Sequence, residues 1–417
     1  MTGAQTKTEV PGAGGLLTDH IALGVLADAF PRELLDEVLT ATGRQEKRVR
    51  LLPAHVVIRF VLALSLFFRD SYEEVMRKLA GGLVALASWE RAWKVPGPSA
   101  LTQARQRLGV EPMRLLFERA AVPVAQPGTR GAWLAGMRLV ALDGTSLDVA
   151  DTAENAARFG RCGSGPKASA FPKAHLVAVS ECGTHAVIGA VVGSIREGER
   201  TLAPDALHCL QDGMLLLADA GLYSWPLWQR AREHGAHLCW RIGASVELPL
   251  VRTLDDGSYL ALLYAPGLHA PTRRRLLRTA RAGHPLDDDR AQLVRVVEYT
   301  VPDRNPGGEL IVLATDLLDP AHLPAAELAW AYHQRWEHET ALAEIKSQLL
   351  GTAAVLRSKS PELVEQEIYG LLLTHYAVRS FMTRAADQAE LDPDRLSFLR
   401  AVRITRRQVT GQAAFPP

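Results

Sequence analysis

The sequence predicts a mixed α/β (α+β) fold in which helices precede and follow a central β-sheet. Apolar residues recur at helical spacing up to about residue 125, short apolar or alternating runs dominate from residue 137, and a long amphipathic stretch spans residues 323–350. Side chains repeat every 3.6 residues along a helix and every two along a strand, so a change of period indicates a change of element. We therefore expect a helical segment, then a sheet, then helices again.

The first part of the chain, residues 1–130, is expected to be helical. Pro31 interrupts a helical pattern and suits the first turn of a second helix. Helices are predicted over residues 17–42, 54–69, 72–86 and 100–108. The last of these follows a Pro-Gly-Pro-Ser break and carries Arg105 and Arg107. These arginines are either contacts of a helix that enters a DNA groove or solvated side chains of a packing helix, and the sequence supports both equally.

Residues 131–243 contain runs that are typical of strands. Strands are predicted over residues 138–143, 175–181, 186–194, 214–219 and 236–242, with helices over 199–210 and from 225 onward. The turn Cys182-Gly183-Thr184 indicates a hairpin between the second and third strands. This order of three strands, a helix, a strand, a helix and a strand describes a ribonuclease-H-like sheet. Asp143 and Asp219 stand at the predicted ends of the first and fourth strands.

The rest of the chain alternates between strand and helix patterns. Residues 244–308 alternate Val, Leu and Tyr with Gly, Asp and Arg, which predicts a β-rich insertion. A strand over 309–318 and a long helix over 323–350 make residues 309–350 the second part of the sheet core. Residues 351–417 are predicted to form a helical C-terminal segment, because Ser360-Pro361-Glu362 is a helix start followed by an apolar pattern.

The composition is ordinary for a globular protein, with 47% hydrophobic and 22% charged residues in 417. A chain of this length can form two or three domains. The four cysteines lie far apart without a Cys-x-x-Cys pair, which predicts buried free thiols in a reducing compartment. The apolar run at residues 54–68 is too short to span a membrane and contains His55 and Arg59. We expect a cytoplasmic protein without membrane association.

Positive charge is local in this chain. Lys and Arg number 47 against 46 Asp and Glu, and the net charge of +1 gives no bulk attraction to nucleic acid. Basic runs occur at Arg44, Lys47, Arg48 and Arg50, at Arg273, Arg274, Arg275, Arg278 and Arg281, and at Arg400, Arg403, Arg406 and Arg407. Each run is either a DNA contact or a solvated surface, and the sequence does not decide between them.

One face of the predicted helix over 323–350 combines an acid with cations and a phenol. Offsets of three, seven and fourteen residues place Tyr332, Arg335, Glu339 and Lys346 within a narrow arc at about 100° per residue. A carboxylate between two cations on one face suits a metal ion held beside a phosphodiester. The alternative is a solvated helix surface with a Glu-to-Lys pair. Trp336 lies off this arc, and we expect it to be a packing residue.

Three acids are candidates for a shared metal site. Asp143 and Asp219 are held by strands, and Glu339 lies on a helix that can pack across the sheet edge. Converging carboxylates repel unless cations neutralise them, and hard oxygen ligands favour Mg²⁺. Two such ions roughly 3.5–4 Å apart can activate water or a 3′-hydroxyl. Other acids compete for these positions, namely Asp148, Asp151, Glu337 and Glu344.

These motifs carry a resemblance to a known family. The spacing of Tyr332, Arg335, Glu339 and Lys346 matches without a gap the signature of the insertion-sequence-4 family of DDE transposases. The runs at residues 142–145 and 217–223 resemble that family's two Asp motifs, and residues 16–86 resemble its helical N-terminal domain. The resemblance extends over about residues 16–385.

The resemblance implies metal-dependent cut-and-paste transposition. Asp143, Asp219 and Glu339 would hold two Mg²⁺ ions, or Mn²⁺ in their place. Water would free a 3′-hydroxyl at the terminal inverted repeat, and that hydroxyl would then attack a phosphodiester of target DNA. The family also implies a homodimer that pairs two element ends at the nucleoid.

The resemblance assigns further residues to DNA. Tyr332, Arg335 and Lys346 would hold phosphates near the cleavage point, and the helical N-terminal domain with Arg105 and Arg107 would bind DNA. One departure concerns residues 245–308, which lack the tryptophan on which better-known members stack a flipped base. Two alternatives stay open: a ribonuclease-H-like nuclease that only hydrolyses DNA, and a domesticated DNA-binding protein without catalysis.

Overall fold

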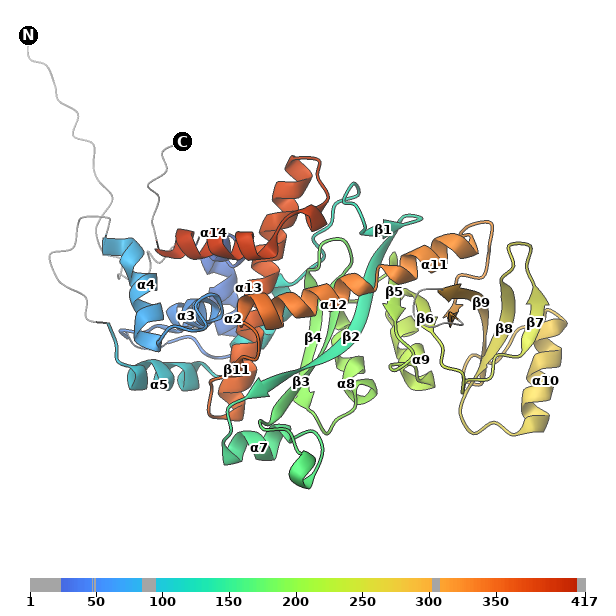
Figure 1. Ribbon diagram of the computed structural model, residues 1–417, viewed down its shortest axis with the longest axis horizontal. Coiled ribbons are helices and arrows are strands. Elements are labelled where there is room, and N and C mark those ends of the chain that lie inside the picture. The colour runs from blue at the N-terminus through green and yellow to red at the C-terminus, as the bar shows by residue number, and fades with distance from the viewer. Residues whose placement is uncertain (1–23, 47, 49, 85–94, 302–307, 411–417) are drawn as a thin grey trace, which may run out of the picture.

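The computed structural model describes residues 24–46, 48, 50–84, 95–301 and 308–410. Within these residues the strands form one eleven-stranded sheet, whose main path runs β4-β3-β2-β5-β6-β10-β9-β8-β7 (Figure 1). Two short strands, β1 (Trp133–Leu134) and β11 (Val355–Leu356), pair with β2 outside this path. Helices lie at both ends of the sheet and along it, so the mixed α/β prediction is confirmed.

The predicted core is built from five neighbouring strands. Antiparallel pairs join β2 (Met137–Val149) to β3 (Lys173–Glu181) and β3 to β4 (Val187–Ser194). Parallel pairs join β2 to β5 (Met214–Ala218) and β5 to β6 (His237–Arg241). Three antiparallel strands followed by two parallel ones, with crossover helices between them, are the ribonuclease-H-like arrangement that the sequence predicted.

Strand β2 is longer than expected. The sequence placed its end at Asp143, whereas the strand continues to Val149 by pairing with β3 as far as Asp148. The apolar run stops at Asp143 because the neighbour on the other side, β5, stops there too: the last parallel partners are Leu142 and Ala218. Asp143 therefore lies inside a strand, at the level where its parallel neighbour ends.

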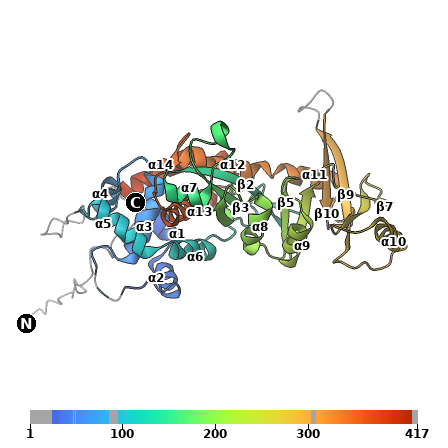
Figure 2. The ribbon, with the colours of Figure 1, turned by 90° about the horizontal axis from the view of Figure 1, so that it is seen from below.

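The segment over 244–308 extends the same sheet. Its strands are β7 (Leu250–Thr253), β8 (Tyr259–Tyr264) and β9 (Ala291–Val301), and β10 (Glu309–Thr315) joins them to β6. The expected β-rich insertion also contains a helix, α10 (Ala270–Arg281), that the sequence analysis did not predict. Its arginine run hid the helical pattern, because few apolar residues mark the buried side. Figure 2 shows α10 at the far end of the sheet.

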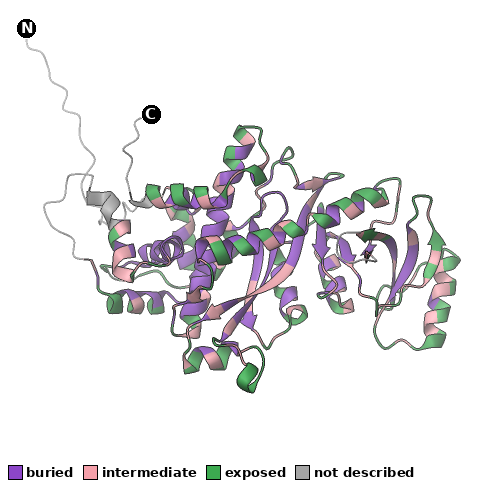
Figure 3. Cartoon of the chain, viewed as in Figure 1, coloured by how far each residue is buried: buried purple, intermediate pink, exposed green. Residues whose placement is uncertain are grey.

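The N-terminal helices share a core with the C-terminal part of the chain. They are α1 (Val25–Ala29), α2 (Arg32–Ala41), α3 (Ala54–Leu66), α4 (Tyr72–Val84), α5 (Pro98–Leu108) and α6 (Glu111–Ala120). All of α3 is buried, and α13 (Pro361–Gln388) packs against it (Figure 3). The predicted helix start at residue 17 lies outside the described residues.

The remaining helices cover the core sheet and close the chain. They are α7 (Ala153–Phe159), α8 (Glu199–Ala206), α9 (Trp225–Glu233) and α14 (Phe398–Thr410), with short 3-10 turns at Gly165–Lys167, Leu207–Cys209 and Pro393–Arg395. No helix in the described ranges combines the length and apolar character needed to cross a bilayer. Cys182 and Cys239 are buried free thiols as expected, but Cys162 is exposed.

The predicted continuous helix over 323–350 consists of three pieces. These are α11 (Ala325–His333), α12 (Trp336–Ala343) and a π-helical turn over Glu344–Leu349. Between α11 and α12 the backbone tightens, because the N–H of Arg335 bonds to the carbonyl of Tyr332 at 3.1 Å, three residues back. Side-chain periodicity does not distinguish such a tight turn from an unbroken helix, so the sequence prediction was wrong on this point.

Candidate active site

The sheet places two acids side by side. Asp143 follows the last residue of β2 that pairs with β5, and Asp219 follows the last residue of β5. The backbone N–H of Gly144 donates to Asp143 Oδ1 at 2.8 Å. The indole N–H of Trp240 donates to the backbone carbonyl of Asp219 at 3.0 Å, which fixes the chain at the end of β5.

The α11–α12 region brings the helix signature to these acids. Arg335 donates through Nη1 to Asp143 Oδ2 at 2.9 Å and through Nη2 to Glu339 Oε1 at 3.1 Å. The hydroxyl of Tyr332 donates to Asp219 Oδ1 at 3.1 Å. Arg335 therefore joins Asp143 to Glu339, while Asp219 is held by Tyr332 and lies 3.8 Å from Arg241 Nη1. The carboxyl groups come from β2, from the end of β5 and from α12.

The fourth residue of the signature faces the same place. Lys346 lies in the π-helical turn after α12, and its Nζ donates to Thr145 Oγ1 at 3.1 Å. Lys346 is exposed, whereas Tyr332 and Arg335 are almost fully buried. Of these three predicted DNA contacts, only Lys346 presents its charge to solvent in this arrangement.

The electrostatics of the site favour a cation. Burial raises the pKa of Asp143, and the charges of Glu199 and Asp219 raise it further, while the Gly144 N–H and Arg335 oppose the shift. Burial also raises the pKa of the Tyr332 phenol, and the neighbouring Asp219 carboxylate adds to that effect. Nearby positive charge stabilises the ionised form of an acid beside other acids, and Arg335 supplies it to Asp143 here.

The donor set suits divalent metal ions, although the acids do not form a closed cage. Carboxylate oxygens on rigid elements with partial solvent access are the ligands that Mg²⁺ prefers. Arg335 separates Asp143 from Glu339 by forming a bridge between them. Among the described residues, the group that brings three ligand atoms within 4.8 Å of one another lies elsewhere, at His185, Glu337 and Asp394.

The acids that competed with Asp143 are engaged elsewhere. Asp148 forms an ion pair with Lys173, and Asp151 forms one with Arg161 at 2.5 Å. Both pairs lie further along the chain, near the C-terminal end of β2.

The acids that competed with Glu339 point to the other side of the helix. Glu337 accepts the backbone N–H of Gly183, and burial raises its pKa to about 7. Glu344 is buried against Arg379 and accepts from His375 Nε2 at 3.0 Å. Neither carboxylate faces Asp143 or Asp219.

The sequence analysis missed a fourth acid near Asp143. Glu199 begins α8 and contacts His175 Nε2 through Oε1 at 3.4 Å. A Cβ added at Gly144 would lie 2.3 Å from that same Oε1, so a larger residue there would have to displace the Glu199 side chain. No sequence signal linked Glu199 to Gly144, because α8 packs on the sheet only in the fold.

Replacing Gly144 by alanine tests this contact. We expect the change to push Glu199 off His175 and to cost about 1–3 kcal/mol of stability, the usual range for overpacking. In a Glu199→Ala background the same change is expected to cost less than 1 kcal/mol, on the order of an uncrowded substitution. Thermal unfolding of the four proteins measures the difference, and equal costs in both backgrounds would contradict the packing account.

Two predicted DNA contacts on α5 behave differently. Arg105 is fully buried: Nε donates to Gln366 Oε1 at 2.7 Å and Nη2 donates to the Leu363 carbonyl at 2.9 Å. Its role is to join α5 to α13, so the expectation of a DNA contact was wrong for Arg105. Arg105 and Arg107 are two residues apart on one short helix, and the sequence does not indicate which of the two is buried.

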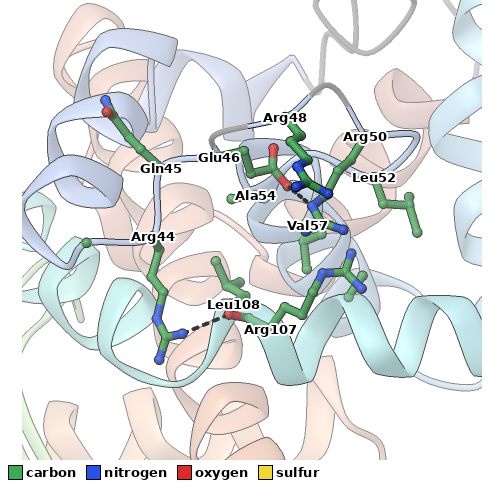
Figure 4. A pocket seen from close by; sticks show the side chains of 12 residues that line it. Arg44, Gln45, Glu46, Arg48, Arg50, Leu52, Ala54, Val57, Arg107 and Leu108 are labelled. Atoms are coloured by element: carbon green, nitrogen blue, oxygen red, sulfur yellow. Dashed lines mark hydrogen bonds and ion pairs between the residues drawn. The ribbon is translucent and has the colours of Figure 1, made fainter.

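Arg107 is exposed and lines a basic pocket of about 420 Å³ beside α5 (Figure 4). Arg44 donates through Nη1 to the Arg107 carbonyl at 3.1 Å, and Arg48 and Arg50 lie across the pocket. Glu46, the one acid in the lining, sits 3.9 Å from Arg50, and burial raises its pKa. Lys47, which belongs to the same basic run, lies outside the described residues.

Trp336 was expected to be a packing residue, but it is among the exposed large hydrophobic side chains. Its side chain is 45% exposed at the start of α12. The Arg335 guanidinium carbon lies 6.0 Å from the centre of its ring. The prediction failed because Trp336 begins a new helix after the tight turn and points outward beside the site.

Residues 134–376 match the family described as the transposase DDE domain, which is more than half of the chain. Residues 20–118 match the N-terminal domain of the insertion element 4 transposase. The chain belongs to the insertion-sequence-4 family of DDE transposases. It is therefore an enzyme of the DDE type that acts on DNA and uses divalent metal ions.

Two curated relatives come from Escherichia coli K12. The transposase is 29% identical over 405 residues to transposase InsG of insertion sequence element IS4, covering 94% of this chain and 84% of InsG. It is 26% identical over 286 residues to the putative transposase InsZ, covering 64% of this chain and 92% of InsZ. Among solved structures, the piggyBac transposase synaptic complex with hairpin DNA is 12% identical, covers 94% of this chain and 82% of that chain, and has a TM-score of 0.49.

Proposed function

We propose that this transposase cuts DNA at terminal inverted repeats and joins the freed 3′-hydroxyl to target DNA with Asp143, Asp219 and Glu339 as its catalytic acids. The observation that carries the proposal is that two neighbouring residues of the helix signature contact all three carboxylates: Arg335 bonds to Asp143 and Glu339, and Tyr332 bonds to Asp219. Two Mg²⁺ ions, or Mn²⁺ in their place, would supply Lewis-acid activation of the attacking oxygen and stabilise the leaving oxygen.

The residues of this chain would position both reactions. In the first, water attacks a phosphodiester at the element end and the bond between phosphorus and the 3′-oxygen of the element's terminal nucleotide breaks, so the element keeps a 3′-hydroxyl and the flanking DNA keeps the 5′-phosphate. In the second, that hydroxyl attacks a target phosphodiester and displaces the target 3′-oxygen. Asp143 is held by the Gly144 N–H and Asp219 by Tyr332, so both carboxylates keep their direction through the two steps.

Arg335 would change partners in this scheme. Metal ions held by Asp143 and Glu339 would need the space that its guanidinium occupies between them. Once the metal ions neutralise the two carboxylates, Arg335 would bind the reacting phosphate instead. Tyr332 then positions Asp219, and Lys346 contacts a phosphate from the exposed end of the same face.

Lys346→Ala tests the phosphate contact. We expect weaker binding to the element end and a salt dependence whose logarithmic slope is smaller by about 0.9, the value for one lost phosphate contact. Lys359→Ala is the matched control, because Lys359 is also exposed and lies after the helix signature. Fluorescence anisotropy across a salt series gives both slopes. A Lys346→Ala slope equal to that of the control would exclude the contact.

The remaining parts of the chain are assigned from position and charge. We propose that residues 1–130 bind the terminal repeats through the pocket formed by Arg44, Arg48, Arg50 and Arg107. Residues 131–243 and 309–350 form the catalytic core, residues 244–308 the insertion, and residues 351–417 the C-terminal segment. A homodimer at the nucleoid would pair two ends, one at each active site.

A joining assay distinguishes this proposal from its alternatives. Purified protein is incubated in Mg²⁺ with a supercoiled plasmid and with element ends that are either uncut or pre-cut. Covalent joining of the end to the plasmid is expected. Cleavage of uncut ends without joining would favour a nuclease, and binding without either reaction would favour a DNA-binding protein without catalysis.

A further inference from the structure

A second basic pocket, of about 600 Å³, lies at the far end of the catalytic helix face. Three segments distant in sequence form it: the α3–α4 turn, the chain that follows Lys346, and α14. Ser347 and Gln348 line the pocket directly after Lys346. The pocket is therefore continuous along the chain with the exposed cation of the active site.

The pocket is lined mainly by cationic side chains. They are Arg69, Lys78, Arg403 and Arg406, and the lining contains one carboxylate, that of Asp70. Asp70 is already paired with Lys78. In the described part of the chain, the side chains of Arg69 and Arg403 make no hydrogen bond or ion pair. Both side chains are exposed.

The cations of this pocket lie close enough to affect one another, as Arg406 shows. Its Nε donates to the Leu66 carbonyl at 2.6 Å, which fixes the guanidinium in the wall of the pocket. Burial lowers the pKa of Arg406, and the charges of Arg403 and Arg69 lower it further against the opposing effect of Asp70. Cations held this close to one another favour an anion between them.

The turn after the catalytic helix is shaped to receive Arg69. Gly351 has a φ of +97°, and a Cβ built there would lie 3.0 Å from Arg69 Nη2. Glycine adopts this backbone conformation without strain and leaves room for the arginine. The Arg69 guanidinium thus lies beside the segment that follows Lys346.

We propose that this pocket binds a phosphate of the DNA strand that passes Lys346, using Arg69 and Arg403. The inference rests on the proposed function, since Lys346 marks the path of the strand. One strand of a duplex carries a phosphate for about every 3.4 Å of helix axis, so a strand held at Lys346 offers further phosphates to neighbouring cations. The openness of the site to solvent and its position beside the catalytic face suit a polymer better than a small free anion.

Alanine substitutions of the two pocket arginines, with a control arginine on α14, test this contact. Arg403→Ala and Arg69→Ala are each expected to reduce the logarithmic salt slope of element-end binding by about 0.9 in the absence of divalent ions. Arg400→Ala is the control, because Arg400 is exposed on α14, removes the same charge and does not line the pocket. Thermal unfolding should be the same for all three variants.

Neutral phosphates locate the contact. Element ends carrying a single methylphosphonate at successive positions near the cleavage point are bound to wild-type and Arg403→Ala proteins. At one position, the methylphosphonate should weaken binding to the wild-type and Arg400→Ala proteins but not to the Arg403→Ala protein. Equal slopes for Arg403→Ala and Arg400→Ala, or the absence of any coupled position, would overturn the proposal. Binding is measured without chemistry, so a wild-type protein that fails to cleave or join would refute the proposed function and leave this test standing.

Discussion

Glu339→Gln is expected to reduce end cleavage by about a thousand-fold, equivalent to about 4 kcal/mol of transition-state stabilisation. The amide keeps the size of the side chain and its place on α12 but loses the negative charge that would hold a divalent ion. Binding to the element end should stay within a few-fold of wild type, because Glu339 is an acid and does not attract phosphate. Single-turnover cleavage and anisotropy measure the two effects separately.

Glu337→Gln is the matched control for that experiment. Glu337 lies two residues away on the same helix and accepts the Gly183 N–H on the opposite side. Its pKa is raised to about 7 by burial, so an uncharged amide resembles a form that the carboxyl group already adopts near neutral pH. Cleavage by Glu337→Gln should remain within a few-fold of wild type. A thousand-fold loss in both variants would show that the helix, and not a metal ligand, had been damaged.

Glu344→Ala is expected to cost about 3–5 kcal/mol of stability, the range for removing one partner of a buried ion pair. Glu344 is buried in the π-helical turn and accepts from Arg379 Nε at 2.8 Å and from His375 Nε2 at 3.0 Å. Its removal leaves the Arg379 charge without its partner in the core. Glu118→Ala, which breaks an exposed pair with Arg114, should cost less than about 1 kcal/mol. Denaturant unfolding of both variants provides the comparison, and equal costs would contradict the account.

The effect of Glu344 should depend on pH in a defined direction. Burial alone would raise the pKa of Glu344, but hydrogen bonds from His185 and His375 and the charge of Arg379 outweigh it and lower the pKa. A lowered pKa in the folded state means that the stabilisation is complete above the ordinary value of 4.5 and is lost as the pH falls through the folded value. The stability gap between wild type and Glu344→Ala should therefore narrow below about pH 4.5.

The helix signature could be recognised from the sequence because helical geometry links spacing to direction. Tyr332, Arg335 and Glu339 face the acids even though α11 and α12 are separate helices, since the turn between them keeps helical backbone angles. The two aspartates were recognised because apolar runs end where neighbouring strands end. Both inferences used local patterns only.

The features that escaped prediction depend on tertiary contacts. Arg105 and Arg107 lie two residues apart on one helix, and only the packing of α5 against α13 decides that Arg105 is buried. Glu199 approaches Gly144 only because α8 packs on the sheet. The continuation of β2 past Asp143 depends on its partner β3. Sequence periodicity contains none of this information.

Anomalous scattering from Mn²⁺ in crystals of the transposase bound to an element end tests the central claim most directly. The account predicts two Mn²⁺ peaks roughly 4 Å apart, ligated by Asp143, Asp219 and Glu339, with the Arg335 guanidinium displaced from its bridge. The other group of metal-ligand side chains, His185, Glu337 and Asp394, lies on the opposite side of α12 and should be free of metal. Mn²⁺ at that group, with Arg335 still bonded to Asp143 and Glu339, would contradict the account.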